Sequence, residues 1–163
     1  MYKFLVDSDA LIKISKAEFL DAVTENFDVF ITEEIYEETI IEGKKGFYHD
    51  ADDIERLIQN SKIKILKGGH YKKKEKSKPG FGRGELSILQ AYKKDSLIVT
   101  DDLSFTSYMQ KERIKSISSA HLLLALVKKD KMDKDKAYYH LERLKPFIRK
   151  DVYELVKNDF KGE

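Results

Sequence analysis

The sequence predicts an α/β fold: a central sheet of parallel strands flanked by helices in three layers, with a helical C-terminal tail. Two observations support this prediction. Short runs rich in β-branched residues alternate along the chain with longer amphipathic segments, an order typical of parallel strands joined by helices. The chain has 163 residues, which is enough for one domain with its own hydrophobic core.

The first half of the chain predicts three strands and the helices between them. The strands are expected at 3–6 ("KFLV"), 28–32 ("DVFIT") and 62–66 ("KIKIL"). Apolar residues at helical spacing predict two short helices within 8–27, broken near Glu18. The same spacing predicts a helix over 33–43, which Gly43 ends, and another over 51–60.

The second half begins with a long loop at 67–84, which holds five of the eight glycines and the basic run "YKKKEKSK" at 71–78. This run has two interpretations, a solvated loop or a set of phosphate contacts. Beyond it we expect a helix over 85–95, a strand at 97–100, a helix over 102–112 and a short strand at 113–117. From Ser119 the chain is expected to be helical, with Pro146 separating the last two helices. We expect residues 1–130 to form the main domain and 131–163 a helical extension packed on it.

Composition limits the classes of function. The net charge of +2 excludes a strong overall attraction for nucleic acid, although local patches remain compatible with it. The absence of cysteine excludes disulfides and thiolate metal sites, and a cytoplasmic location is expected. The longest apolar stretch, at 121–127, is too short to span a membrane, and the first strand follows the start too closely for a leader peptide.

Paired acids follow two of the predicted strands. Asp7 and Asp9 follow the first strand, and Asp101 and Asp102 follow the strand "LIVT". Each of these residues could simply cap a helix. Together, however, four carboxylates at the carboxyl edge of a parallel sheet would repel one another unless a cation lay among them. Hard oxygen donors without histidine or cysteine favour Mg²⁺ or Mn²⁺.

Two glutamates are expected at the same edge. Glu38 lies inside the helix that follows the second strand, and Glu85 opens a helix after the glycines of "GFGRGEL". Glu85 could alternatively serve only as a favourable charge at a helix N-terminus. Glu33 and Glu37, on the same helix as Glu38, are interpreted as solvated.

These motifs resemble the PIN-domain ribonucleases, which include VapC-type toxins. In that family an aspartate after the first strand is followed by a small polar residue and an acid or amide, as in Asp7, Ser8 and Asp9. The later motifs match at Thr32, Ile35 and Glu38, at Glu85, and at Thr100 and Asp102, with Asp101 as a substitute for Asp102. Order and spacing agree over about residues 3 to 125. The compact toxins of the family end soon after the last strand, whereas this chain continues with further helices.

The resemblance implies a metal-dependent endoribonuclease that hydrolyses RNA phosphodiester bonds, either a VapC-type toxin or a related RNA-processing enzyme. Asp7, Glu38, Glu85 and Asp102 would be the catalytic metal ligands, with Asp9 and Asp101 close by. Ser8 and Thr100 would hold a ligand water or orient a carboxylate. The implied cofactor is Mg²⁺ or Mn²⁺, and the implied partners are RNA and an antitoxin protein.

Two other functions stay open. "VDSDAL" also fits the start of a haloacid-dehalogenase-like phosphatase, although Leu11 stands where that family has Thr or Val, and Lys93 and Lys94 look solvated. Alternatively, the acids could be intact but idle in a PIN-like binding module. A homodimer is also expected, because the stretch "AHLLLALV" at 120–127 could pair with a second copy; its alternative is an ordinary core helix.

Overall fold

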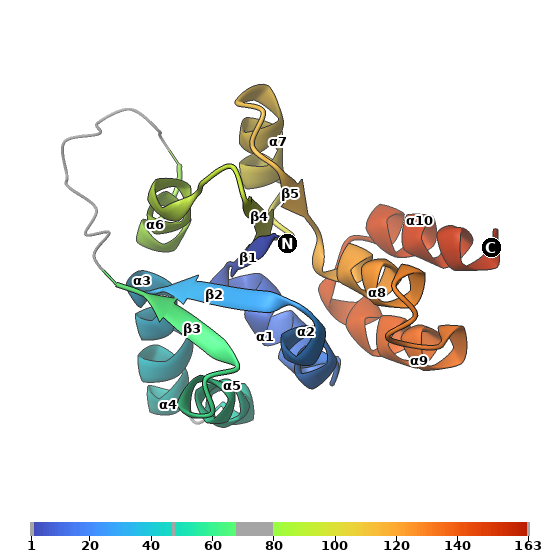
Figure 1. Cartoon of the computed structure of the whole chain (residues 1–163), viewed down its shortest axis with the longest axis horizontal. Coiled ribbons are helices and arrows are strands. Elements are labelled where there is room, and N and C mark those ends of the chain that lie inside the picture. Colours follow the sequence, from blue (N-terminus) through green and yellow to red (C-terminus); the bar gives the residue numbers. More distant parts are fainter. Residues whose placement is uncertain (1, 47, 68–79, 163) are drawn as a thin grey trace.

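The computed structural model describes residues 2–46, 48–67 and 80–162 (Figure 1). Within them five parallel strands form one sheet in the order β3-β2-β1-β4-β5. The strands are β1 (Lys3–Val6), β2 (Asp28–Thr32), β3 (Ile63–Leu66), β4 (Ser96–Val99) and β5 (Ser116–Ile117). The predicted α/β fold with a parallel central sheet is therefore confirmed, and each strand lies within one or two residues of its expected position, apart from β5, which is shorter.

Helices flank this sheet and continue to the end of the chain. Those before β3 are α1 (Ser8–Lys16), α2 (Leu20–Asn26), α3 (Glu33–Tyr36), the π-helical η1 (Glu37–Ile41), α4 (Glu42–Lys45) and α5 (His49–Gln59). The later ones are α6 (Arg83–Ala91), α7 (Leu103–Lys111), α8 (Ser119–Lys128), α9 (Lys134–Leu144), the 3₁₀ turn η2 (Lys145–Phe147) and α10 (Lys150–Lys161). Glu18 has a φ of 67° between α1 and α2, and Pro146 lies in η2. Both predicted breaks are confirmed.

The prediction that Gly43 ends a helix is wrong. The helix that starts at Glu33 runs through η1 to Lys45, and Gly46 caps it. A Cβ atom at Gly43 would lie 3.0 Å from the Cβ of Ala51 in α5. Gly43 is therefore needed for the close approach of α4 and α5 rather than for a stop. The predicted basic run at 71–78 lies outside the described residues.

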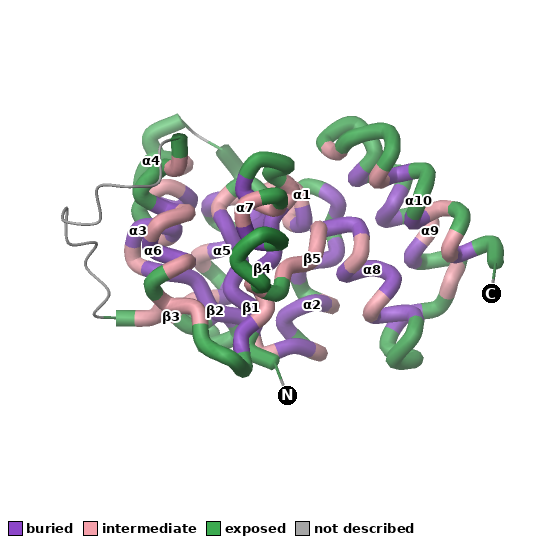
Figure 2. The backbone as a smooth tube through the Cα atoms, turned by 90° about the horizontal axis from the view of Figure 1, so that it is seen from above, coloured by how far each residue is buried: buried purple, intermediate pink, exposed green. Residues whose placement is uncertain are grey.

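The core is centred on the middle strands. Phe4, Leu5 and Val6 of β1 are all buried, as are all residues of β2 after Asp28. Successive residues of a strand point to opposite faces, so both faces of these strands are covered by helices (Figure 2). This is the burial expected for a parallel sheet.

The C-terminal helices belong to the same hydrophobic core. Leu141 and Leu144 of α9 and Tyr153, Val156 and Phe160 of α10 join the cluster that contains the strands. Helices α8, α9 and α10 pack against one another beside the sheet, and α9 also contacts α1 (Figure 1). The division at residue 130 falls in the turn between α8 and α9 and stays a proposal.

The stretch "AHLLLALV" forms most of α8, and it is mainly buried inside its own chain. Leu122, Leu123 and Leu126 are fully covered. The core-helix alternative is therefore correct, and the predicted homodimer loses the surface that motivated it. Among the described helices, none has the length and apolarity needed to cross a membrane.

The strand order places a crevice at one edge of the sheet. From β1 the chain proceeds outward to β2 and β3, and it then returns to the other side of β1 with β4 and β5. The switch point lies between β1 and β4, where Lys3–Val6 pairs with Ser96–Val99. Ligands of open parallel sheets bind outside the carboxyl ends of the strands at such a point.

Candidate active site

Asp7 lies at the switch point and is the most buried of the predicted site acids. It follows β1 and caps α1, and its Oδ1 accepts a hydrogen bond of 2.7 Å from the backbone N–H of Ala10. The Thr100 hydroxyl donates a short hydrogen bond to Oδ2. The residue is only 6% exposed, and burial raises the pKa of Asp7 to about 7 although both hydrogen bonds lower it. Asp7 is thus a carboxyl group that is costly to ionise without a cation.

Asp102 lies on the neighbouring strand end and is exposed. It caps α7, because its Oδ1 accepts a hydrogen bond of 2.7 Å from the N–H of Phe105. Its own backbone N–H lies 3.2 Å from the Thr100 hydroxyl that also binds Asp7. Thr100 therefore links the two aspartates, as a residue that orients a carboxylate would.

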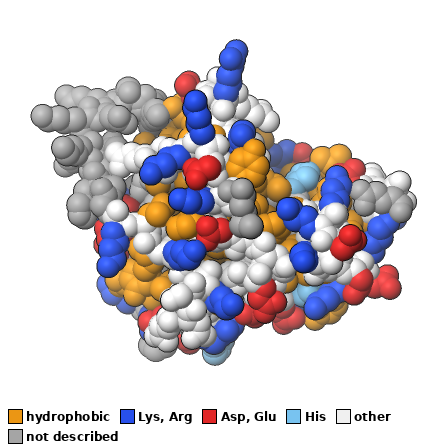
Figure 3. All heavy atoms as spheres, viewed as in Figure 1, with side chains coloured by type: hydrophobic (Ala, Val, Ile, Leu, Met, Phe, Trp, Pro, Cys, Tyr) orange, Lys and Arg blue, Asp and Glu red, His pale blue; other side chains and the backbone are white. Residues whose placement is uncertain are grey.

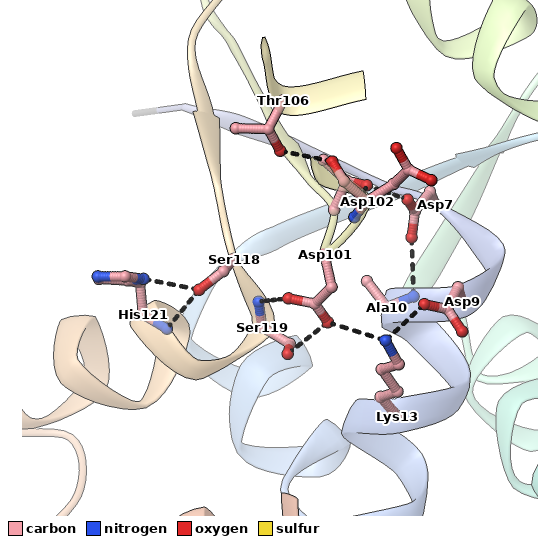
Figure 4. A network of polar contacts seen from close by, with 11 residues as sticks. Asp7, Asp9, Ala10, Lys13, Asp101, Asp102, Thr106, Ser118, Ser119 and His121 are labelled. Atoms are coloured by element: carbon pink, nitrogen blue, oxygen red, sulfur yellow. Dashed lines mark hydrogen bonds and ion pairs between the residues drawn. The ribbon is translucent and has the colours of Figure 1, made fainter. Parts of the chain in front are cut away.

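The adjacent carboxylates of Asp101 and Asp102 have different surroundings. Asp101 accepts hydrogen bonds from the backbone N–H of Ser119, at 2.9 Å, and from the Ser119 hydroxyl, at 2.6 Å (Figure 4). The ammonium group of Lys13 lies 3.9 Å from Asp101 and 2.7 Å from Asp9. Asp101 thus joins the start of α8 to the edge of the sheet, whereas Asp9 is largely exposed and paired with Lys13.

Glu38 reaches the site from η1. A π-helical turn shifts the side chains relative to a regular helix and is frequent at functional sites. The Ser8 hydroxyl donates a hydrogen bond of 2.7 Å to Oε2 of Glu38. A Cβ atom at Gly84 would lie 2.8 Å from Oε1 of Glu38 and 2.9 Å from Cδ1 of Ile35, so glycine at this position leaves space for both side chains. The absence of a side chain at Gly84, the residue before Glu85, therefore makes room for the Glu38 carboxylate.

Glu85 lies in the first turn of α6. Its Oε2 accepts a hydrogen bond of 2.7 Å from the N–H of Gly82, which holds the side chain over the helix start. Partial burial raises the pKa of Glu85, the Gly82 hydrogen bond opposes this, and the charges of Asp102 and Glu38 raise it further. Glu85 is therefore repelled by both Asp102 and Glu38 across the crevice.

A buried pair of hydroxyl groups positions the helices that carry the glutamates. The hydroxyls of Thr32 and Ser87 are 2.7 Å apart, and Ser87 donates to the carbonyl of Gly84 at 2.6 Å. Thr32 also caps α3 by accepting from the N–H of Ile35. Sequence patterns alone did not single out Ser87, Gly84, Lys13 or Ser119. The small residues of "GRGELS" and the Asp9–Lys13 spacing of four were the available signals.

A cavity of about 580 Å³ collects the predicted acids. Its acidic lining residues are Asp7, Asp9, Glu38, Glu85, Asp101 and Asp102, and Ser8 lines it as well. We call this the acidic cavity. Glu37 is exposed and lies 3.5 Å from Arg83, in keeping with its interpretation as solvated.

The donors of the acidic cavity suit a hard divalent cation. They are carboxylate and hydroxyl oxygens, and a cation would offset both the desolvation of Asp7 and the repulsion felt by Glu85. In the described part of the chain, no three carboxylate or imidazole side chains are arranged closely enough to form a complete metal site. Coordination would therefore require rotation of Glu38, Glu85 or Asp102, none of which is fully buried.

Comparison with known families agrees with this geometry. The model of a PIN domain family, DUF3368, matches residues 3–161. The chain belongs to the PIN-domain family. The match includes α9 and α10, so it extends well past residue 125, where the resemblance of the sequence motifs ends. No curated protein and no solved structure matches the chain. PIN membership implies a nuclease fold, whereas the VapC-like specificity stays a prediction.

Proposed function

We propose that this PIN-domain protein is a metal-dependent endoribonuclease that hydrolyses phosphodiester bonds of RNA. The observation that carries the proposal is the acidic cavity at the β1/β4 switch point, where the buried Asp7 and five further acidic residues line one space. Repelling carboxylates of this kind lower the stability of a protein unless a cation offsets them. Several carboxylates that line one cavity are better explained by a bound cation than by packing.

Asp7, Glu38, Glu85 and Asp102 are the proposed ligands of Mg²⁺ or Mn²⁺. A bound cation of this type lowers the pKa of a coordinated water and polarises the phosphate. Hydrogen bonds keep three of these carboxylates beside the acidic cavity before a cation binds: Thr100 binds Asp7, Ser8 binds Glu38 and the N–H of Gly82 binds Glu85.

Asp9 and Asp101 take outer positions in the proposed site. Both carboxylates interact with Lys13, and Asp101 also holds Ser119. Asp101 would therefore maintain the shape of the site rather than bind the cation. Asp102 is the better ligand of the adjacent pair, because it is exposed and, among the described residues, only one of its two carboxylate oxygens, Oδ1, accepts a hydrogen bond.

Incubation of the purified protein with mixed RNAs, with Mn²⁺ and then with chelator, tests the proposal. We expect cleavage only with the cation, and loss of cleavage in Asp7→Asn and Asp102→Asn. Asp133→Asn is a matched control, because Asp133 caps α9 as Asp102 caps α7 but lies outside the acidic cavity. Metal-dependent binding of RNA without any turnover would instead support the idle binding module.

Three further expectations have separate origins: the family resemblance implies an antitoxin, the stretch at 120–127 suggested a homodimer, and the absence of cysteine suggested the cytoplasm. An antitoxin partner, a homodimer and a cytoplasmic location are proposals that co-purification, light scattering and cell fractionation can test. The phosphatase alternative loses support, because the whole described fold belongs to a PIN domain. Absence of turnover with an aryl phosphate monoester would remove it.

A further inference from the structure

A second cavity adjoins the acidic cavity on the side of the C-terminal helices. Its volume is about 700 Å³, within the range of small-molecule sites in proteins. Residues of β5, α7, α8, η2 and α10 line it, and Asp101 and Leu103 line both cavities. A molecule in the second cavity would therefore lie directly beside the acidic cavity.

The lining combines apolar residues with cations. Ile117, Leu124, Ile148 and Val152 are among its apolar members. Its cationic members are Lys13, Lys128 and Arg149, and its one acid among the described residues is Asp101. The carboxylate of Asp101 already binds Ser119 and lies near Lys13. Lys13 also pairs with Asp9, and the exposed Arg149 pairs with Asp151 at the surface, where an ion pair contributes little and a phosphate can replace the carboxylate. The lining at Arg149 therefore suits a phosphate-bearing ligand that also has an apolar face.

An exposed aromatic side chain borders this cavity. Phe147 lies in η2, and 38% of its surface is exposed. The ammonium group of Lys16 lies 5.2 Å from the centre of the Phe147 ring. Lys16 pairs with Asp50 and lines a different cavity, so Phe147 alone is assigned to this one. Unpaired bases of RNA stack on such exposed aromatic rings. Figure 3 shows Lys and Arg side chains spread over the visible face of the molecule between patches of apolar surface.

His121 provides a polar group in the same lining. Its Nδ1 lies 2.6 Å from the Ser118 hydroxyl, and Nε2 has no hydrogen-bond partner among the described residues. Burial lowers the pKa of His121, which favours the neutral form of the ring. A neutral imidazole can donate or accept a hydrogen bond at the edge of a base.

We propose that the second cavity binds one unpaired nucleotide of a single-stranded RNA whose adjoining phosphate lies in the acidic cavity. The proposal builds on the proposed ribonuclease function, which defines where that phosphate lies. It gives η2 and α10 a role, because they form a wall of the substrate site. The aromatic border and the wall shared with the acidic cavity favour a nucleotide over an acidic peptide.

Fluorescence anisotropy in Mg²⁺ tests this site with a labelled single-stranded RNA of about eight nucleotides and with the corresponding duplex, both with phosphorothioate linkages that resist cleavage. The cation is kept because the acidic cavity would otherwise repel the phosphate. We expect the single strand to bind more tightly, because a paired base cannot enter the cavity. Phe147→Ala should weaken binding by about 5-fold to 100-fold, the range seen when base stacking is removed. Arg149→Gln should reduce the salt dependence of binding by about one phosphate contact.

Tyr48→Ala is the matched control, because Tyr48 is an aromatic residue that is 63% exposed and lies outside both cavities. It should bind RNA as the parent does. If Phe147→Ala has a lowered melting temperature, the exposed Arg149→Gln decides the test alone. Three outcomes would overturn the proposal. The variants could bind RNA as tightly as the parent, or the duplex could bind as tightly as the single strand. Polyglutamate could also displace the labelled RNA as effectively as unlabelled RNA does.

The two proposals can fail separately. Binding that depends on Phe147 in a protein that never cleaves RNA would refute the ribonuclease and leave the nucleotide site in place. Metal-dependent cleavage with no effect of Phe147→Ala or Arg149→Gln on binding would refute only the nucleotide site.

Discussion

The buried carboxyl group of Asp7 makes the stability of the metal-free protein depend on pH. Burial raises its pKa from 3.8 to about 7 in the folded protein. The folded state therefore holds this proton more tightly than the unfolded chain, and the free energy of unfolding falls as pH rises from about 4 to about 7. Asp7→Asn removes the ionisable group, and its amide can still accept the hydrogen bond from the N–H of Ala10 and contact the Thr100 hydroxyl.

The magnitude follows from the same pKa values. Between about pH 4.5 and about pH 8, the parent should lose about 3 kcal/mol of stability that Asp7→Asn does not lose. Urea denaturation of both proteins at the two pH values in chelator measures this difference. Subtracting the result for Asp7→Asn from that for the parent cancels the contribution of other titrating groups. Asp133→Asn, which alters an exposed helix cap, should follow the parent. Identical pH profiles for the parent and Asp7→Asn would refute the assignment of a raised pKa to Asp7.

Three further predictions concern the cation and the frame of the site. Mg²⁺ should raise the melting temperature of the parent at pH 8, because it binds only the folded state, and this rise should shrink in Asp7→Asn. Gly84→Ala should crowd the Glu38 carboxylate and the buried Ile35 side chain, and lower RNA cleavage by about 100-fold. Gly162→Ala, whose added Cβ would meet a backbone oxygen at 3.6 Å, should cleave normally. Asp101→Ala should lower the free energy of unfolding by about 1 to 3 kcal/mol, because it leaves the N–H and hydroxyl of Ser119 without their acceptor. Urea denaturation measures this change, and unchanged stability would contradict the role of Asp101 in holding the start of α8.

Residue types and spacing predicted the parts of the site that depend on strand ends. Asp7 and Asp102 follow short apolar runs, and parallel pairing of those runs brings the two residues to one edge. Glu85 was placed correctly in the first turn of a helix for the same local reason. These features depend on period and position along single elements, which sequence patterns record directly.

The features that escaped prediction depend on contacts between elements. The π-helical turn around Glu38 arises in a stretch that has an ordinary helical pattern. Gly43 resembles a helix stop until α5 packs against it. The different surroundings of Asp101 and Asp102 arise because Ser119 starts α8 beside Asp101. None of these contacts could be derived from local spacing, because each partner lies elsewhere in the chain.

The hydrogen bond between Thr100 and Asp7 joins positions 93 residues apart, and it has a consequence for the timing of biosynthesis. Closing a loop of this length costs conformational entropy before the contact stabilises the fold. A nascent chain that stops before β4 contains Asp7 and Glu38 but neither Thr100 nor Asp102. The acidic cavity can therefore be assembled only after most of the polypeptide has left the ribosome, and incomplete translation products cannot form it.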